Sequence, residues 1–181
     1  MMTYAAFSEY PESATEFKES PDGIYVREWN TPNHEDPLDY ITLNDDRTAL
    51  VLQEGVYRLS GYSSLTMMAG INPVIDTTNA YPGCCYVYDS ARWPALPAPR
   101  DEDFDDFMAS LYAVGSIAVA MYSGLSSFEC IVPVPDGPAR VSVAHQCGYV
   151  SAKAVNKVYV RVGGGDSLYH QTAKISVYKI R

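Results

Sequence analysis

The chain has 181 residues, of which 47% are hydrophobic, and its 22 acidic and 13 basic side chains give a net charge of −9. This length suits one domain that buries enough surface to fold without a metal or a disulfide framework. The acidic balance argues against nucleic acid and anionic membranes as partners, because both are bound through Lys and Arg.

The first 21 residues are polar and carry no clear hydrophobic pattern. We therefore expect an N-terminal arm over residues 1–21 and a single folded domain over residues 22–181. The start of the chain also lacks the basic segment and apolar core of a signal peptide. The longest apolar run, Leu111–Tyr122, is shorter than the roughly 20 residues that a membrane-spanning helix needs. We interpret this run as a buried strand and expect a soluble chain with no membrane insertion.

The first half of the domain alternates between apolar and polar residues in the way that half-buried antiparallel strands do. The clearest example is Val56–Tyr62, where Tyr57 and Leu59 fall on one face and Arg58 on the other. Asn30–Pro37 reads as a loop because it combines Asn and Pro. The strands expected in this half cover Gly23–Trp29, Leu38–Leu43, Ala49–Met68 with a break at Glu54-Gly55, and Gly83–Asp89.

The second half opens with a Pro-rich, acidic segment, Ser90–Asp106, which we expect to be a surface loop because its prolines exclude a central strand. Asp103–Tyr112 could form a short helical turn, but we expect strand structure to resume from about Leu111. A Pro-Asp-Gly turn at 135–137 separates two later strands. The strands expected in this half cover Phe128–Val134, Ala139–Gln146, Lys157–Val162 and Ala173–Arg181.

Many short strands at regular spacing, with no convincing long helix, indicate an all-β sandwich or barrel. In such a fold the inward faces of two sheets interdigitate to form the core. The residues that we expect to be mostly buried there are Leu43, Leu50, Leu52, Leu59, Val87, Val119, Ile131, Val141, Val143, Val160, Ile175 and Val177.

The order of these segments resembles the jelly-roll heads of the complement-globular-head and tumour-necrosis-factor superfamily. Glu54–Leu59 occupies the place of that family's Pro-Gly-x-Tyr-x-Phe element, with Leu59 where a Phe is usual. The resemblance covers about Tyr40 to Arg181. It implies an antiparallel, tumour-necrosis-factor-like jelly-roll sandwich and a compact homotrimer whose outer loops bind a ligand without catalysis. It implies no particular ligand residue.

The sequence offers little support for catalysis or metal binding. There is no His-x-His pair, no Cys-x-x-Cys spacing and no Gly-x-Ser-x-Gly element. We interpret His34 as a surface residue, His145 as a packed or hydrogen-bonded strand residue in preference to the partner of a Cys147 nucleophile, and His170 as a hydrogen-bonding group at a strand end. We favour a solvated acidic loop over a calcium site at 101–106. We expect a protein that is not an enzyme and has no cofactor.

The four cysteines do not form the pattern of a disulfide framework. Cys84 and Cys85 are adjacent, so on a strand they point to opposite faces and only one can face inward. We expect them, with Cys130 and Cys147, to be reduced thiols that pack as small hydrophobic groups. This favours a cytoplasmic protein or one assembled into a particle, although the sequence does not identify the compartment.

The Ser90–Asp106 loop is the best candidate for ligand binding, because it is long and stiffened by prolines. Within it we assign ligand binding to Trp93 and Phe104, with Asp101 and Asp103 beside them. An aromatic ring flanked by carboxylates suits a sugar or a basic protein surface. The alternative is that Trp93 plugs the end of the sandwich or a subunit seam.

The chain has 15 tyrosines, which are typical both of interfaces and of sheet packing. The leading hypothesis is a non-enzymatic, trimeric recognition or assembly module, such as a fibre tip or lectin-like head, that binds a protein or glycan through outer loops. The first alternative is a structural subunit of a capsid, tail or surface appendage with no small-molecule ligand. The second is an enzyme on a β scaffold.

Overall fold

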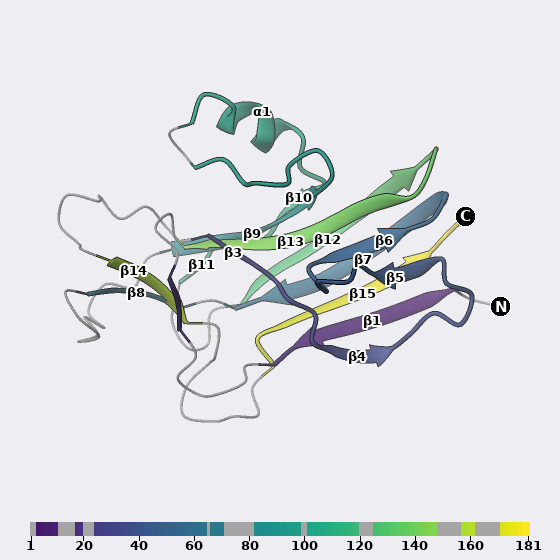
Figure 1. Cartoon of the computed structure of the whole chain (residues 1–181), viewed down its shortest axis with the longest axis horizontal. Helices are drawn as coiled ribbons and strands as arrows, with labels where there is room; N and C mark the ends of the chain where they lie inside the picture. The colour runs from purple at the N-terminus through teal and green to yellow at the C-terminus, as the bar shows by residue number, and fades with distance from the viewer. Residues whose placement is uncertain are drawn as a thin grey trace.

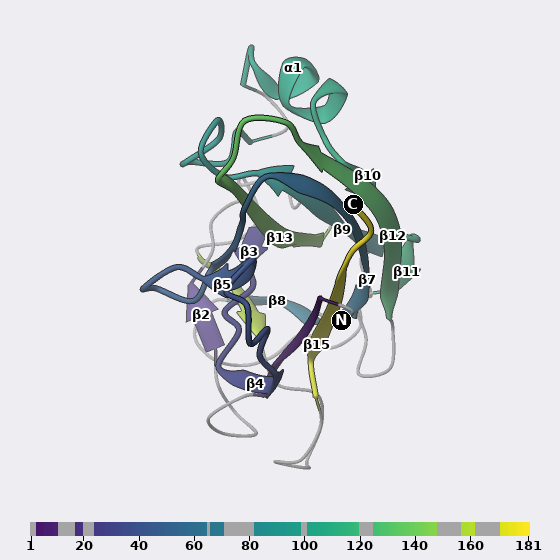
Figure 2. The same ribbon diagram turned by 90° about the vertical axis from the view of Figure 1, so that its right-hand side faces the viewer.

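The computed structural model describes residues 3–10, 17–19, 24–64, 66–70, 82–98, 101–119, 125–147, 157–161 and 171–181. Two antiparallel sheets face each other in these residues, and a small third sheet lies beside them (Figure 1). The end-on view in Figure 2 shows the two large sheets enclosing the core. The all-β sandwich predicted from the sequence is confirmed.

The first sheet has the strand order β12-β7-β15-β1-β4. Its strands are β1 (Tyr4–Glu9), β4 (Thr31–His34), β7 (Gly55–Ser63), β12 (Ser126–Val134) and β15 (Ala173–Lys179).

The second sheet has the order β10-β9-β13-β6-β5, and two further strands join it, β11 on β9 and β3 on β13. Its strands are β3 (Ile24–Val26), β5 (Ile41–Leu43), β6 (Ala49–Leu52), β9 (Pro82–Asp89), β10 (Ala113–Val114), β11 (Ala118–Val119) and β13 (Ala139–Cys147). The small third sheet consists of β2 (Phe17–Glu19), β14 (Lys157–Arg161) and β8 (Thr66–Gly70).

The chain crosses repeatedly between the two large sheets. Strand β6 lies in the second sheet, β7 in the first, β9 in the second, β12 in the first, β13 in the second and β15 in the first. Neighbours within a sheet therefore come from distant parts of the chain, as in the Greek keys of a jelly roll. The strand order itself assigns the fold as a double-sheet jelly roll.

Strict alternation along β12 determines which side chains enter the core. Ser126, Phe128, Cys130, Val132 and Val134 face inward, and the residues between them face solvent. Because the side-chain period of a strand is two residues, a shift of one position exchanges the two faces. The predicted burial of Ile131 is wrong for this reason: its side chain is 51% exposed on the outer face.

Most of the other expected core residues lie between the sheets. Leu43 is only partly buried against this core, and the side chains of Val119 and Val160 lie outside the described residues. The expected residues that are buried are Leu50, Leu52, Leu59, Val87, Val141, Val143, Ile175 and Val177.

The folded domain begins earlier than residue 22, the start predicted from the sequence pattern. Residues 4–9, expected to belong to an arm, form β1 in the interior of the first sheet between β15 and β4. Ala5 and Phe7 enter the core from this strand. The segment was missed because its main partner, β15, is at the other end of the sequence, where a local pattern gives no signal.

Two other expectations are corrected. Residues 31–34, expected within a loop, form β4, an edge strand on which Pro32 is tolerated because edge strands leave backbone groups unpaired. The apolar run from Leu111 is not one buried strand. Its described part forms the short strands β10 and β11, and Ile117 between them is 81% exposed.

The Pro-rich segment leads into α1 (Phe104–Ala109), the single helix among the described residues. The expected loop, Ser90–Asp106, therefore ends earlier than predicted, because α1 begins at Phe104. Figure 1 shows α1 over the outer face of β9 and β13. At six residues, α1 is far below the length needed to cross a membrane, and the described residues contain no other helix that could do so.

Candidate functional site

The predicted recognition loop folds down onto the outer face of the second sheet. Phe107 of α1 is almost fully buried there, with edge-on ring contacts to Tyr86 and Tyr88, both at 5.9 Å between centroids. Trp93 packs edge-on against the same ring at 5.4 Å, and Phe104 lies 6.3 Å away. We call Trp93, Phe104 and Phe107 the aromatic cover.

Trp93 has protein partners at its ring and at its polar tip. The indole Nε1 donates a hydrogen bond of 2.8 Å to Ser110 Oγ, and the Arg92 guanidinium lies 5.5 Å from the ring centroid. The ring is half-buried. Among the described residues it packs under α1 on the side of the sandwich, and not at the end of it.

Asp101 and Asp103 are exposed at the start of α1. The Asp101 carboxylate accepts a hydrogen bond of 2.7 Å from the Ala98 backbone N–H, and the Asp103 carbonyl accepts one of 2.9 Å from Phe107. All four predicted site residues therefore lie in one segment, with the two rings turned toward protein and the two carboxylates toward solvent. Their assignment to ligand binding stays a prediction.

A second cluster, the buried polar cluster, joins the two sheets inside the sandwich. Arg27 donates to Glu9 Oε2 at 3.1 Å, to Ser63 Oγ at 2.8 Å, and to the Ser64 carbonyl. Tyr25 donates to the other Glu9 oxygen at 2.6 Å. Burial raises the pKa of Glu9 and opposes the nearby Arg27 guanidinium, which lowers it. Sequence reasoning missed this cluster because charged residues are normally assigned to the surface.

The same cluster contains a serine–histidine contact. Ser63 Oγ and His145 Nδ1 lie 2.8 Å apart. Burial, with a smaller contribution from Arg27, lowers the pKa of His145 to about 3, so the ring is neutral near pH 7. Because Ser63 Oγ accepts the Arg27 Nε–H, its own proton is free to be donated to Nδ1. The expected hydrogen-bonded strand histidine is confirmed.

This contact does not have the arrangement of a catalytic triad. The cluster's carboxylate, Glu9, contacts Arg27 and Tyr25, whereas a triad carboxylate orients the histidine. Ser63, His145 and Arg27 are essentially inaccessible to solvent. The geometry therefore fits a link that holds β1, β7 and β13 together.

The outer face of the first sheet carries aromatic side chains among charged ones such as Arg58 and Glu129, and we call this aromatic group the tyrosine face. Tyr4 pairs with Tyr178 across β1 and β15, and their rings stack at 4.5 Å between centroids. His34 of β4, exposed as expected, stacks on Tyr4 at 5.2 Å. Tyr62 lies on the same side of β7, and Ile131 on the same side of β12.

A separate exposed apolar group lies where β10, β11 and β12 close one side of the sandwich. Val114 and Leu125 are each 50% exposed, and Ile117 is more so. Backbone and side-chain hydrogen bonds between Ser116 and Ser127, both 2.9 Å, join the two sheets here. We call Val114, Ile117 and Leu125 the apolar edge.

The adjacent cysteines point to opposite faces, as expected. Cys85 lies in the core between the sheets, whereas Cys84 packs with the residues under the aromatic cover. Burial raises the pKa of both thiols and raises that of Cys130 to about 11. These three are free thiols in the structure, and the side chain of Cys147 lies outside the described residues. That all four are reduced in the cell stays a prediction.

No protein family and no curated protein sequence matches this chain. Among solved structures the chain is similar to Eiger TNF from S. frugiperda, with a TM-score of 0.47 and 9% identity over 99% of this chain and 93% of that one. At this level of similarity the jelly-roll assignment rests on the strand order of the chain itself. Membership of the superfamily that the sequence resembles stays a prediction.

Proposed function

We propose that this protein is a self-associating recognition or assembly module without catalytic activity, and that its subunits join head to tail as a homotrimer. The observation that carries the proposal is the presence of two unlike surfaces on one sandwich, one with partly exposed aromatic rings and one with exposed aliphatic side chains. The tyrosine face lies on the outer side of the first sheet, and the apolar edge lies along the side closed by β10, β11 and β12.

Two unlike surfaces favour a ring over a two-fold dimer. A two-fold interface uses the same patch on both subunits, whereas a head-to-tail interface joins one patch to another and closes when the rotation permits. Tyrosine is enriched at interfaces because its ring buries a large area while its hydroxyl stays hydrogen-bonded. The number three comes from the family resemblance in the sequence.

The test is the molecular mass in solution of the native chain and of two interface variants. Light scattering of the native chain at micromolar concentration should give three times the chain mass of 20.0 kDa. Ile117→Asp should abolish association through the apolar edge, and Tyr178→Ser should weaken it through the tyrosine face. Leu38→Ser is the matched control, because Leu38 is also an exposed apolar residue but belongs to neither surface.

Mixing the two variants distinguishes a ring from a dimer. Each variant keeps one intact surface, so an equimolar mixture should form a heterodimer and nothing larger. A native chain that is monomeric at micromolar concentration contradicts the proposal. So does a dimer that Tyr178→Ser dissociates and Ile117→Asp leaves intact, since this would indicate a two-fold contact through the tyrosine face alone.

The recognition role, with a protein or glycan as ligand, rests on the exposed carboxylates of Asp101 and Asp103 and on the half-buried rings of Trp93 and Phe104. A screen of glycans and of cell-surface proteins against the intact assembly tests it. Binding that Asp101→Asn and Asp103→Asn weaken supports recognition. An assembly that binds nothing in the screen favours the alternative, a structural subunit of a capsid, tail or appendage.

The absence of catalysis is part of the same proposal. It is supported by the serine–histidine contact, which is sealed inside the sandwich and, among the described residues, has no carboxylate that orients the histidine. A cytoplasmic or particle-bound location, with reduced thiols, is also proposed. Free-thiol titration of freshly prepared protein in denaturant should detect all four cysteines.

A further inference from the structure

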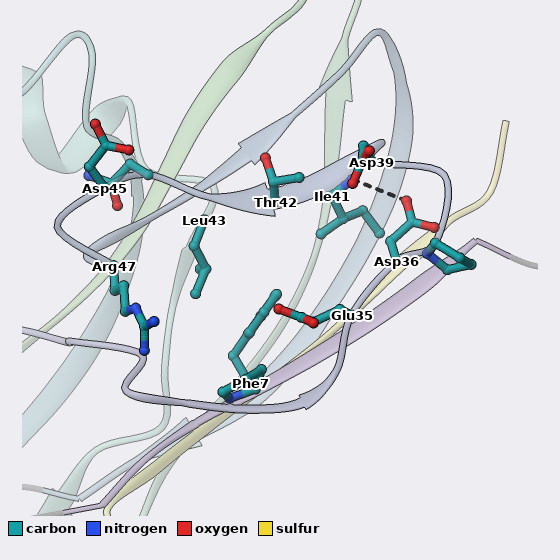
Figure 3. Close-up of a pocket in the computed structure, with 12 residues that line it drawn as sticks. Phe7, Glu35, Asp36, Asp39, Ile41, Thr42, Leu43, Asp45 and Arg47 are labelled. Atoms are coloured by element: carbon teal, nitrogen blue, oxygen red, sulfur yellow. Dashed lines mark hydrogen bonds between the residues drawn. The ribbon is translucent and has the colours of Figure 1, made fainter.

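A cavity of about 580 Å³ lies beside β4 and β5, which Figure 2 shows on the opposite side of the sandwich from β11 and β12. It lies where β1 and β4 of the first sheet meet β5 of the second (Figure 3). Sites for small molecules are concave, have volumes of about 300–1,000 Å³, and combine an apolar lining with a few polar groups. The volume of this cavity lies within that range.

The floor of the cavity is apolar and belongs to the core. Phe7 of β1 and Ile41 of β5 are almost fully buried, and Leu43 is partly buried beside them. Figure 3 shows Ile41 and Leu43 pointing from β5 toward Phe7. A ligand that enters this cavity therefore meets hydrocarbon at its inner end.

The walls of the cavity are two turns whose conformations are fixed by hydrogen bonds. In the first, the buried Asp36 carboxylate accepts backbone N–H bonds from Leu38, Tyr40 and Ile41 at 3.1, 2.8 and 3.2 Å. In the second, Asn44 accepts from Ala49 through its side chain at 2.8 Å and from Arg47 through its carbonyl at 2.9 Å. The cavity is therefore preformed, which reduces the entropy lost on binding.

The rim carries an excess of negative charge. Glu35, Asp39 and Asp45 are exposed carboxylates, and Arg47 is the one cation among the lining residues that the structure describes. None of the three carboxylates forms an ion pair within the described part of the chain. Figure 3 shows Glu35 extending across the cavity in front of Phe7, whereas the Asp45 carboxylate turns outward.

We propose that this cavity binds a small organic cation, an amine or guanidine on an apolar body, whose charge pairs with Glu35 and whose hydrocarbon contacts Phe7, Ile41 and Leu43. A carboxylate above a low-dielectric floor attracts a cation more strongly than one on an open surface, because low-dielectric walls focus the field. A charged N–H donor to carboxylate oxygen also makes a stronger hydrogen bond than a neutral pair does. An anion of the same shape is repelled by the rim.

The test uses three probes with one shape and three charges: 2-phenylethylamine, 2-phenylethanol and phenylacetate. Each is titrated into the isotopically labelled full chain, and backbone amide chemical shifts are followed. The amine should shift the amides of residues 35–47 and bind at least about tenfold more tightly than the alcohol, and the anion should not bind.

Two charge-neutralising variants locate the site. Glu35→Gln should weaken binding of the amine by about fivefold to tenfold, in line with the loss of one charged hydrogen bond. Asp45→Asn removes the same charge from the same rim, but its carboxylate faces outward, so it should change the affinity less than twofold. Equal melting temperatures for the two variants show that the comparison is made between folded proteins.

Four outcomes overturn the proposal. They are no shift with the amine, equal affinity for the amine and the alcohol, shifts confined to residues outside 35–47, and equal weakening by both variants. Equal weakening would mean that the amine responds only to the net charge of the chain. Cation binding and trimer formation are measured separately, so failure of one leaves the other intact.

Discussion

His145 should make the stability of the protein depend on pH. Its pKa falls from an ordinary 6.5 to about 3 because it is buried. Below pH 6.5 the unfolded chain binds a proton on this residue and the folded protein does not, so stability falls as pH falls toward 3. The slope contributed by one such group reaches about 1.4 kcal/mol per pH unit.

Urea unfolding of the native chain and of His145→Asn, between pH 7.5 and pH 5, measures this contribution. Asparagine can place an acceptor near the position of Nδ1 without titrating, so the variant should lose most of the slope below pH 6.5. His34→Asn is the control, because His34 is exposed, and it should keep the slope of the native chain. Identical slopes in all three proteins would show that His145 does not control the acid response.

Trp93→Ala distinguishes a packing role from a recognition role at a single residue. The substitution removes the ring contact with Phe107 and the hydrogen bond to Ser110. We expect a loss of about 1–3 kcal/mol, less than for a fully buried tryptophan because the ring is half-exposed. Trp93→Phe keeps a ring there and should lose less. An unchanged melting temperature together with lost ligand binding would instead make Trp93 a recognition residue.

At the scale of single strands, inward and outward residues should differ sharply in their contribution to stability. Ile175 of β15 is fully buried between the sheets, and Ile175→Ala should cost about 2–5 kcal/mol. Ile131 of β12 is the matched control, because it is the same residue type on the outer face of the same sheet. Ile131→Ala should cost less than about 1 kcal/mol.

Both substitutions are best measured by urea unfolding in the Ile117→Asp background, which we expect to be monomeric. In a monomeric variant the free energy of unfolding includes no contribution from subunit contacts. If Ile131→Ala costs as much as Ile175→Ala in this background, the outer face of β12 is covered within one subunit and cannot contribute to a subunit contact.

The sequence predicts the fold class and the position of several strands, but it does not predict the place of every strand in a sheet. Alternating patterns locate β7, β12, β13 and β15, and the Pro-Asp-Gly turn separates β12 from β13, because these signals act over a few residues. The assignment of a strand to the inside of one sheet depends on distant partners. This is why the local pattern of residues 4–9 predicts an arm, although β1 pairs with β15 in the structure.

The candidate sites, too, could be predicted only where they depend on residues close together in the sequence. The sequence located Trp93, Phe104 and the acidic residues in one loop, but it could not determine that the rings pack on Phe107, because that contact depends on how α1 folds back. The buried Arg27–Glu9 pair and the cavity at Glu35 depend on contacts between the two sheets. The spacing of residue types along the sequence does not predict contacts between distant segments.

The pairing of β1 with β15 also has a consequence for biosynthesis. A nascent chain grows from its N-terminus, and Tyr4 pairs with Tyr178. At the usual rate of translation, about 5–20 residues per second, roughly 9 to 35 seconds pass between the synthesis of β1 and that of its partner. During that time the edge of β1 that β15 later covers has no partner, and an open strand edge invites association between chains. The half-made protein therefore exposes a strand edge, open to association with other chains, that the finished protein covers.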